Sequence, residues 1–260
     1  MLTFLILGAH PDDPDAETGG LALKLRKKGH KVIFLSLSNG NAGHHTMDRD
    51  SLRLRRLDEM KHVAEVYDIT YDTFDMDDGY LTADIATRDR LIRYIRQVKP
   101  DVVIAPRSCD YHPDHRAVGQ LVCDCSYLVG VPLICPDAPM LHYHPVILYS
   151  EDRFTMPAPF RADIGVDIDE FIDRKIHGLL QHVSQYYEWL PYDGKWPGVL
   201  EAETFEEATA ILTAREKERF AGPVRRFPEK FAEGVTYGEV FQIDEYGGSM
   251  TDEILRAMTE

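Results

Sequence analysis

The chain of 260 residues has few cysteines, fewer basic than acidic side chains and no long apolar run. Its cysteines have no regular spacing and predict no disulfide framework; they are Cys109, Cys123, Cys125 and Cys135. Cys123 and Cys125 are two positions apart on an expected helix, so they point in different directions and are poorly placed to share a metal. The sequence pairs no base with Cys109, which argues against a nucleophile. A reduced, cytosolic protein fits this pattern best.

Acidic residues outnumber basic ones: the chain has 44 Asp and Glu but only 29 Lys and Arg, which gives a net charge of -15 at pH 7. Phosphate binding needs clustered Lys and Arg, so we expect no nucleic-acid partner and no docking on anionic lipid. No stretch approaches the roughly 20 apolar residues that span a bilayer. The N-terminal run MLTFLILGAH has no basic segment before it and predicts a strand rather than a signal peptide. We therefore expect a cytoplasmic protein.

Apolar runs alternate with amphipathic stretches, which is typical of an α/β protein. The expected strands are 2–7, 31–37, 71–74 and 102–105, and the expected helices are one ending near 27, then 49–67, about 86–98 and about 115–128. This alternation predicts a mostly parallel sheet with right-handed crossovers, in a Rossmann-like three-layer fold.

The composition, 44% hydrophobic, allows one large core. We expect a single domain over 1–260, with a Rossmann-like core of about 1–165 and a C-terminal α/β elaboration of about 166–260. A helix from about Ile168 to Tyr187 is expected in the elaboration, with Asp167 and Asp169 as capping acids. On this helix His177 and His182 are predicted to be packed or surface residues rather than ligands.

Two strings rich in histidine and aspartate follow two of the expected strands. AHPDDPDAETGG, 9–20, follows the first strand, and HPDH, 112–115, follows the fourth. In an open α/β sheet these two strands are neighbours at the switch point, where ligands bind. The two loops can supply three metal ligands with carboxylate and imidazole groups to spare, whereas a catalytic zinc takes three and leaves a position for water. The strings therefore predict the site of a divalent-metal hydrolase.

Each string also has a purely structural explanation. Asp12, Asp13 and Asp15 could be cap and first-turn residues of the following helix, where acidic side chains are favoured. Asp114 could cap the later helix, and His10 could pack at the strand end. Two such strings after two neighbouring strands favour the metal site over these separate explanations.

The glycines argue against a dinucleotide-binding protein. That class needs a G-x-G-x-x-G turn after the first strand, but only Gly8 stands there, and Gly19 and Gly20 fall inside the next helix. Asp12 and Asp13 would repel a pyrophosphate at this position.

The two strings, AHPDD with a following acidic residue and Gly-Gly, and DYHPDHRAVG over 110–119, resemble the PIG-L or LmbE-like family of metal-dependent N-deacetylases. Further matching segments are Arg56-x-x-Glu59, Asp78-Gly79-x-Leu81, Lys175 to Gln185, and Tyr237-x-Glu239-x-Phe241. The resemblance implies an LmbE-like fold and a hydrolase that releases acetate and a free amine from an N-acetylglucosamine-type conjugate, a small molecule. It favours a homo-oligomer while the number of subunits stays open.

The resemblance also implies that His10, Asp13 and His115 bind the metal. Zn²⁺ suits these ligands, although Fe²⁺ or Co²⁺ can occupy them. Asp15 stands where the family commonly has Glu, and it is the first candidate for a hydrogen bond to a ligand histidine.

Three further residues receive catalytic roles from the resemblance. Asp12 would be the general base that activates water, and His112 would stabilise the oxyanion or protonate the leaving amine. Asp114 would hold an imidazole in its working tautomer, and Tyr111 is a second candidate for the oxyanion.

Substrate contacts are expected from Arg56, Asp78, Tyr111 and Asn41, the last in the loop SNGNAGHH over 38–45. An aromatic segment in the elaboration could stack on a sugar, cover the sheet or form a contact between subunits; it comprises Tyr186, Tyr187, Trp189, Tyr192 and Trp196.

Two other classes of protein fit part of the pattern. A non-catalytic metal- or sugar-binding module would keep His10, Asp13 and His115 yet tolerate the loss of Asp12. Two histidines and a carboxylate also describe non-haem Fe(II) oxygenases, but nothing in the sequence predicts the β-jelly-roll that usually carries that site.

Overall fold

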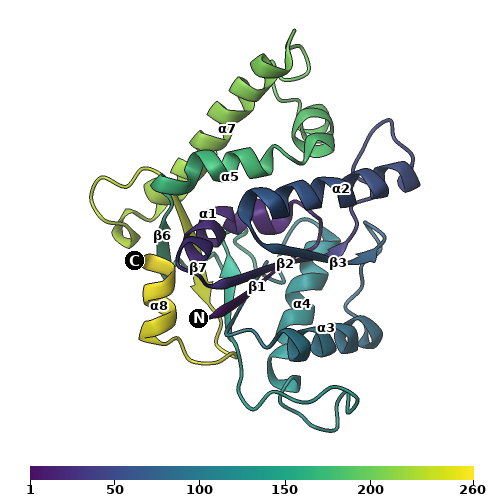
Figure 1. Cartoon of the computed structure of the whole chain (residues 1–260), viewed down its shortest axis with the longest axis vertical. Helices are drawn as coiled ribbons and strands as arrows, with labels where there is room; N and C mark the ends of the chain where they lie inside the picture. Colours follow the sequence, from purple (N-terminus) through teal and green to yellow (C-terminus); the bar gives the residue numbers. More distant parts are fainter.

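A computed structural model of residues 1–260 has a mixed α/β fold, in which helices cover both faces of one seven-stranded sheet (Figure 1). The strands are β1 Thr3–Gly8, β2 Lys31–Ser38, β3 Thr70–Met76, β4 Val102–Ala105, β5 Val146–Ser150, β6 Ile164–Asp167 and β7 Gly238–Ile243. The α-helices are α1 Asp13–Lys27, α2 Arg49–Tyr67, α3 Ile85–Val98, α4 Pro113–Leu128, α5 Ile172–Leu179, α6 Leu190–Asp193, α7 Phe205–Arg226 and α8 Asp252–Thr259. None of these helices has the length and apolar character needed to cross a membrane.

The strand order is β3-β2-β1-β4-β5-β7-β6. Strands β1 to β5 pair in parallel, whereas β7 runs antiparallel to both β5 and β6. As the sequence predicts, β1 and β4 are neighbours, and their outgoing connections diverge to β2 on one side and β5 on the other. This switch point leaves room at the carboxyl ends of β1 and β4.

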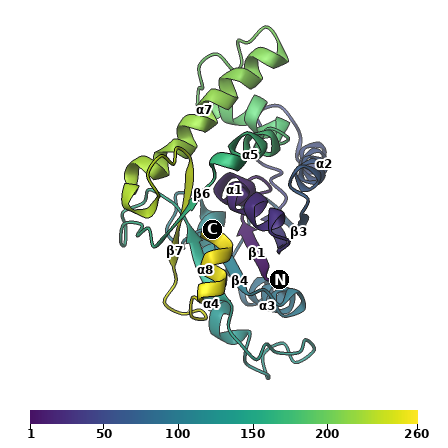
Figure 2. The ribbon, with the colours of Figure 1, turned by 60° about the vertical axis from the view of Figure 1, so that its left-hand side comes forward.

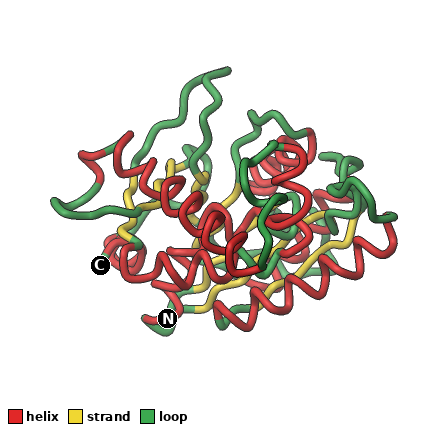
Figure 3. The backbone as a smooth tube through the Cα atoms, turned by 90° about the horizontal axis from the view of Figure 1, so that it is seen from above, coloured by secondary structure: helices red, strands yellow, loops and turns green.

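Side chains of β1 alternate between two hydrophobic cores. Phe4 and Ile6 face the core beneath α1, α2 and α5, and Leu5 and Leu7 face the core beneath α3 and α4. Figures 1 and 2 show these two helical layers on opposite sides of the sheet, and Figure 3 shows helices lying over the strands. A strand buried on both faces explains why this sequence is almost continuously apolar.

The C-terminal part of the chain joins the same sheet through β6 and β7. The prediction of a single helix over 168–187 is wrong. The segment forms a 3₁₀ turn at Asp169–Phe171, then α5, and after a break a π-helix at Ser184–Trp189. Glu59 of α2 accepts hydrogen bonds from the Ser184 amide and hydroxyl, both at 2.7 Å. These long-range contacts fix the start of the π-helix just after the break, at a place where the apolar spacing alone favours one continuous helix.

A buried ion pair fixes the middle of α1. The carboxylate of Glu239, on β7, accepts the backbone N–H groups of Gly20 and Leu21 at 2.7 and 2.8 Å. Lys175, on α5, donates to the same carboxylate at 2.7 Å and to the carbonyl of Ala16 at 2.9 Å. Helix α1 is thereby held against β7 and α5, and its first turn has a fixed place at the end of β1.

Candidate metal centre and catalytic cavity

The turn from β1 into α1 fixes Asp13. Its carboxylate accepts the backbone N–H groups of Ala9 and His10 at 2.9 and 2.8 Å. The turn is tight because a Cβ on Gly8 would lie 2.6 Å from both the Asp13 and the Pro14 side chains. Asp13 therefore points back across the strand end, beside the ring of His10.

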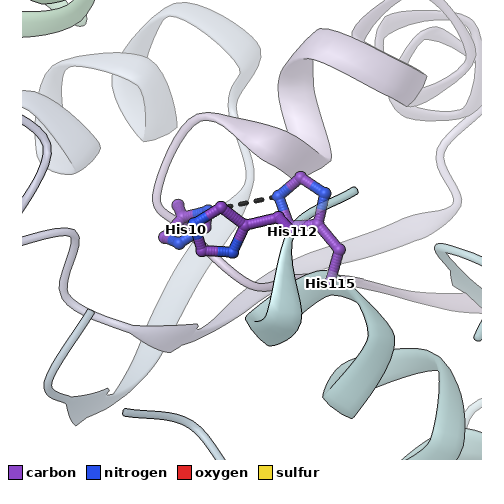
Figure 4. A group of neighbouring side chains, drawn as sticks. All are labelled: His10, His112 and His115. Carbon is purple, nitrogen blue, oxygen red and sulfur yellow. Dashed lines mark hydrogen bonds between the residues drawn. The ribbon is translucent and has the colours of Figure 1, made fainter. Parts of the chain in front are cut away.

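The loop between β4 and α4 brings two more imidazoles to this place. The ring centroids of His10 and His112 are 4.6 Å apart, and those of His10 and His115 are 5.2 Å apart. Figure 4 shows the three rings converging, with the hydrogen bond between His10 and His115 dashed. Their nitrogen atoms are close enough together to hold one metal ion.

Three donor atoms form a nearly equilateral triangle. His10 Nδ1 lies 3.4 Å from Asp13 Oδ2, Asp13 Oδ2 lies 3.3 Å from His115 Nε2, and His115 Nε2 lies 3.3 Å from His10 Nδ1. Ligands about 2.0–2.1 Å from a tetrahedral zinc ion are about 3.3–3.4 Å apart, so this triangle has the size of one face of a zinc site. The residues present fit the metal that the sequence predicts.

The outward nitrogen of each ring in the triangle meets a carboxylate. His10 Nε2 lies 3.1 Å from Asp78 and 3.6 Å from Asp114, and His115 Nδ1 lies 3.1 Å from Asp110. Carboxylates in this position commonly fix the tautomer and orientation of metal-binding histidines. The proton on His10 is held at Nε2, which leaves Nδ1 free to bind a cation.

The electrostatics of the triangle favour positive charge. Burial lowers the pKa of His10, but hydrogen bonds with Asp114, Asp13 and Asp78 outweigh it and raise this pKa well above its ordinary value. For His115, burial is likewise outweighed by the charge of Asp13 and the hydrogen bond with Asp110, which raise the pKa to about 10. A divalent cation bound by the triangle would supply the positive charge that the carboxylates favour, and it would displace the protons from the binding nitrogens of His10 and His115.

His112 has a different protonation state. Its Nδ1 accepts the backbone N–H of Asp114 at 3.2 Å, so the proton of the neutral ring is on Nε2. Burial, followed by the nearby charges of His10 and His115, lowers the pKa of His112 below its ordinary value. The ring is a neutral hydrogen-bond donor beside the triangle.

Asp12, at the N-cap of α1, does not cap the helix with its side chain. Its carboxylate accepts a hydrogen bond from Arg56 of α2, a side chain that is only 2% exposed. The Arg56 guanidinium lies against Gly40, whose φ of +68° and lack of a side chain make this approach possible. Arg56 thus orients a carboxylate that stands next to the triangle.

A cavity of about 720 Å³ lies over these groups. Eight of the ten predicted site residues line it: His10, Asp12, Asp13, Arg56, Asp78, Tyr111, His112 and His115. Arg56 and Asp78 are turned mainly toward Asp12 and His10, while Tyr111 is 73% exposed at the rim.

The two remaining predicted residues lie behind the cavity wall. Asn41 donates to Asp77 at 2.7 Å and accepts the backbone N–H of Asp78 at 3.1 Å, so it holds the loop that carries Asp78. Asp114 is fully buried and accepts the backbone N–H of Gly79 at 2.8 Å.

The role of Asp15 differs from the expectation. It is fully buried and pairs with His182 at 2.7 Å rather than with His10 or His115, because its place in the first turn of α1 directs it toward the α5 side. Sequence reasoning missed Asp110, which contacts His115 and also accepts the His112 amide at 2.8 Å. Its position just before the HPDH string was the available signal.

The family model described as GlcNAc-PI de-N-acetylase, PIG-L, matches residues 5–126. Residues 5–126 form a PIG-L family domain. The matched segment runs from β1 into α4 and contains both loops of the candidate metal centre.

Two curated proteins resemble the chain over similar lengths. Diacetylchitobiose deacetylase from Thermococcus kodakarensis is 28% identical over 201 residues, which cover 72% of this chain and 73% of the relative. A 4-oxalmesaconate hydratase from Pseudomonas putida is 24% identical over 196 residues, which cover 72% of this chain and 76% of the relative.

Among solved structures, the N,N'-diacetylchitobiose deacetylase from Pyrococcus horikoshii in complex with an inhibitor superposes with a TM-score of 0.74. It is 20% identical, and the match covers 93% of this chain and 83% of that chain. The LmbE-like α/β fold predicted from the sequence is confirmed by this likeness.

Proposed function

We propose that the protein is a zinc-dependent N-deacetylase that hydrolyses the acetamide of an N-acetylated sugar conjugate. The observation that carries this proposal is the triangle of His10, Asp13 and His115, whose donor atoms are spaced as zinc ligands are. The three residues of the triangle line the same cavity as Asp12 and His112. The PIG-L domain and the deacetylase among the curated relatives support the same reaction class.

The bound cation would supply Lewis acidity, which polarises a carbonyl and makes a water molecule more acidic. Asp12 is the proposed general base that takes a proton from the attacking water, and Arg56 keeps its carboxylate in place. His112 donates its Nε2 proton in a hydrogen bond to the carbonyl oxygen, where negative charge develops. The proton held by Asp12 passes to the leaving nitrogen, the C–N bond breaks, and acetate and an amine are released.

The charge of the cavity supports an uncharged substrate. Eight carboxyl side chains line it, namely Asp12, Asp13, Glu17, Asp78, Asp110, Glu151, Asp152 and Asp193, against the four guanidinium groups of Arg56, Arg107, Arg153 and Arg219. Even with a divalent cation bound, carboxylates would outnumber positive charges when the histidines are neutral. An N-acetylated sugar fits these walls better than a substrate with several carboxylates.

The test is to incubate the zinc-loaded protein with N-acetylglucosamine and N-acetylated disaccharides and to quantify acetate and free amine. We expect the two products in equal amounts, because each hydrolysed amide yields one of each. Asp12→Asn should lose at least about 100-fold in rate while it keeps its zinc, and Asp58→Asn, at an exposed position on α2, should match the wild type. Absence of acetate and amine with all of these sugars would overturn the proposal. Addition of water to 4-oxalmesaconate by the same protein would then identify a hydratase instead.

A further inference from the structure

The π-helix at Ser184–Trp189 presents one face to the catalytic cavity. Gln185, Tyr186, Trp189 and Leu190 all line the cavity that contains the triangle. A π-helix has about 4.4 residues per turn, so residues four apart in sequence come to lie on the same face. π-Helical turns are rare and occur frequently at functional sites. The turn aligns Trp189 with Gln185 on the cavity side of this segment.

The loop over 39–45 contacts both the segment that carries Trp189 and the residues around the triangle. Gln185 donates to the carbonyl of Gly43 at 3.1 Å, and a Cβ on Gly43 would lie 3.5 Å from Trp189 Nε1. The adjacent Ala42 donates its backbone N–H to Asp78 at 3.3 Å, and Asp78 holds His10. One short loop therefore joins the indole to the metal-binding histidine.

Two other aromatic rings lie beside the indole. Tyr192 lies 6.0 Å from Trp189 between ring centroids, and His45 lies 6.4 Å away in a stacked arrangement. His45 itself stacks on Tyr192 at 3.9 Å and 7°. The indole N–H of this half-buried side chain makes no hydrogen bond within the chain, whereas a buried tryptophan usually places this group on a partner. An aromatic side chain with a free donor thus borders the cavity.

We propose that Trp189 forms a second subsite that binds the neutral pyranose ring attached to the N-acetylated sugar. The inference rests on the proposed function, since it places the reacting acetamide at the triangle. The ring would stack on the indole with its apolar face, and a hydroxyl would accept the indole N–H. The excess of carboxylates in the cavity favours an uncharged ring over an acidic one. The cavity of about 720 Å³ is larger than a single hexosamine fills.

The kinetic test compares N-acetylglucosamine with N,N'-diacetylchitobiose in the zinc-loaded protein. Trp189→Ala should lower kcat/KM for the disaccharide by about tenfold or more and change that for the monosaccharide by less than about twofold. Trp189→Phe keeps an aromatic face and loses the N–H, so it should recover part of the loss. An equal loss for both sugars, or no loss for either, would overturn the subsite.

A binding test without catalysis separates the subsite from the proposed function. The chain has two tryptophans, so Trp196→Phe leaves Trp189 as the only tryptophan fluorophore. Trp196 lies under Arg215, 3.7 Å from the guanidinium to the ring centroid, and does not line the catalytic cavity. In the metal-free Trp196→Phe variant, the disaccharide should change the fluorescence of Trp189 in a saturable way. The change should occur at a lower concentration of the disaccharide than of the monosaccharide. No change with the disaccharide would refute the subsite, whereas failure of hydrolysis alone would refute only the deacetylase assignment.

Discussion

The Nε2 atom of His10 lies 3.1 Å from the carboxylate of Asp78, although 68 positions separate the two residues in the chain. Burial raises the pKa of Asp78, but the hydrogen bond and charge of His10 outweigh it and lower this pKa to about 2. The carboxylate therefore stays ionised and keeps the His10 proton on the nitrogen that faces away from Asp13. The orientation of His10, a proposed metal ligand, depends on a residue that does not belong to the triangle.

Asp78→Asn tests this dependence. The amide can still contact His10 but no longer carries charge, so the affinity for zinc should fall by about 10–100-fold. Competition with a chromogenic chelator measures the change. Asp72→Asn, at an exposed position on β3, should retain the wild-type affinity. Equal affinities for Asp78→Asn and the wild type would show that Asp78 does not support the metal site.

Arg56→Lys tests the orientation of the proposed base. Lysine keeps the positive charge but lacks the planar fork that reaches Asp12 beside Gly40, so kcat should fall by about 10-fold or more while zinc content is unchanged. Steady-state kinetics with metal analysis gives both values. A rise in KM with kcat unchanged would mean that Arg56 contacts substrate and does not position Asp12.

Glu239→Gln tests the buried ion pair that fixes α1. The variant leaves Lys175 buried with a weaker partner, and breaking such a pair typically costs about 3–5 kcal/mol. Urea denaturation should show this loss. Asp58→Asn removes the exposed pair with Lys61 and should change stability by less than about 1 kcal/mol. A similar small change for Glu239→Gln would contradict the structural role of the pair.

Gly20→Ala tests the close approach between α1 and its neighbours. The new Cβ would lie 2.5 Å from Ile168 and 2.8 Å from Glu239, so we expect a loss of about 1–3 kcal/mol. Gly222→Ala, also in a helix, meets only the flexible end of Arg226 at 2.8 Å and should be neutral or stabilising by up to about 1 kcal/mol. If the two variants were equally stable, the packing around Gly20 would be looser than the structure indicates.

The alternation of apolar runs was enough to predict the first four strands, and α2 begins and ends where the sequence indicates. It also predicted the meeting of His10 with HPDH, because parallel strands deliver their carboxyl ends to the same edge of the sheet. These features depend on local patterns and on one general rule of topology. They needed no knowledge of side-chain partners.

Features that depend on distant partners were not predictable in this way. The pairing of Asp12 with Arg56 spans 44 positions, and that of Asp15 with His182 spans 167. The expected helix over 168–187 failed for the same reason, since Glu59 of α2 binds the amide and hydroxyl of Ser184, the first residue of the π-helix that follows the break. The apolar spacing of a segment does not reveal such tertiary hydrogen bonds.

The zinc dependence of the proposed reaction can be measured by adding zinc to metal-free protein, up to one equivalent per chain, and following acetate release from N,N'-diacetylchitobiose. We expect the rate to rise in proportion to bound zinc, and His115→Ala neither to retain zinc nor to release acetate. Acetate release at an undiminished rate by the metal-free protein would contradict a zinc-dependent deacetylase. Stoichiometric zinc binding without hydrolysis of any N-acetylated sugar would contradict it equally.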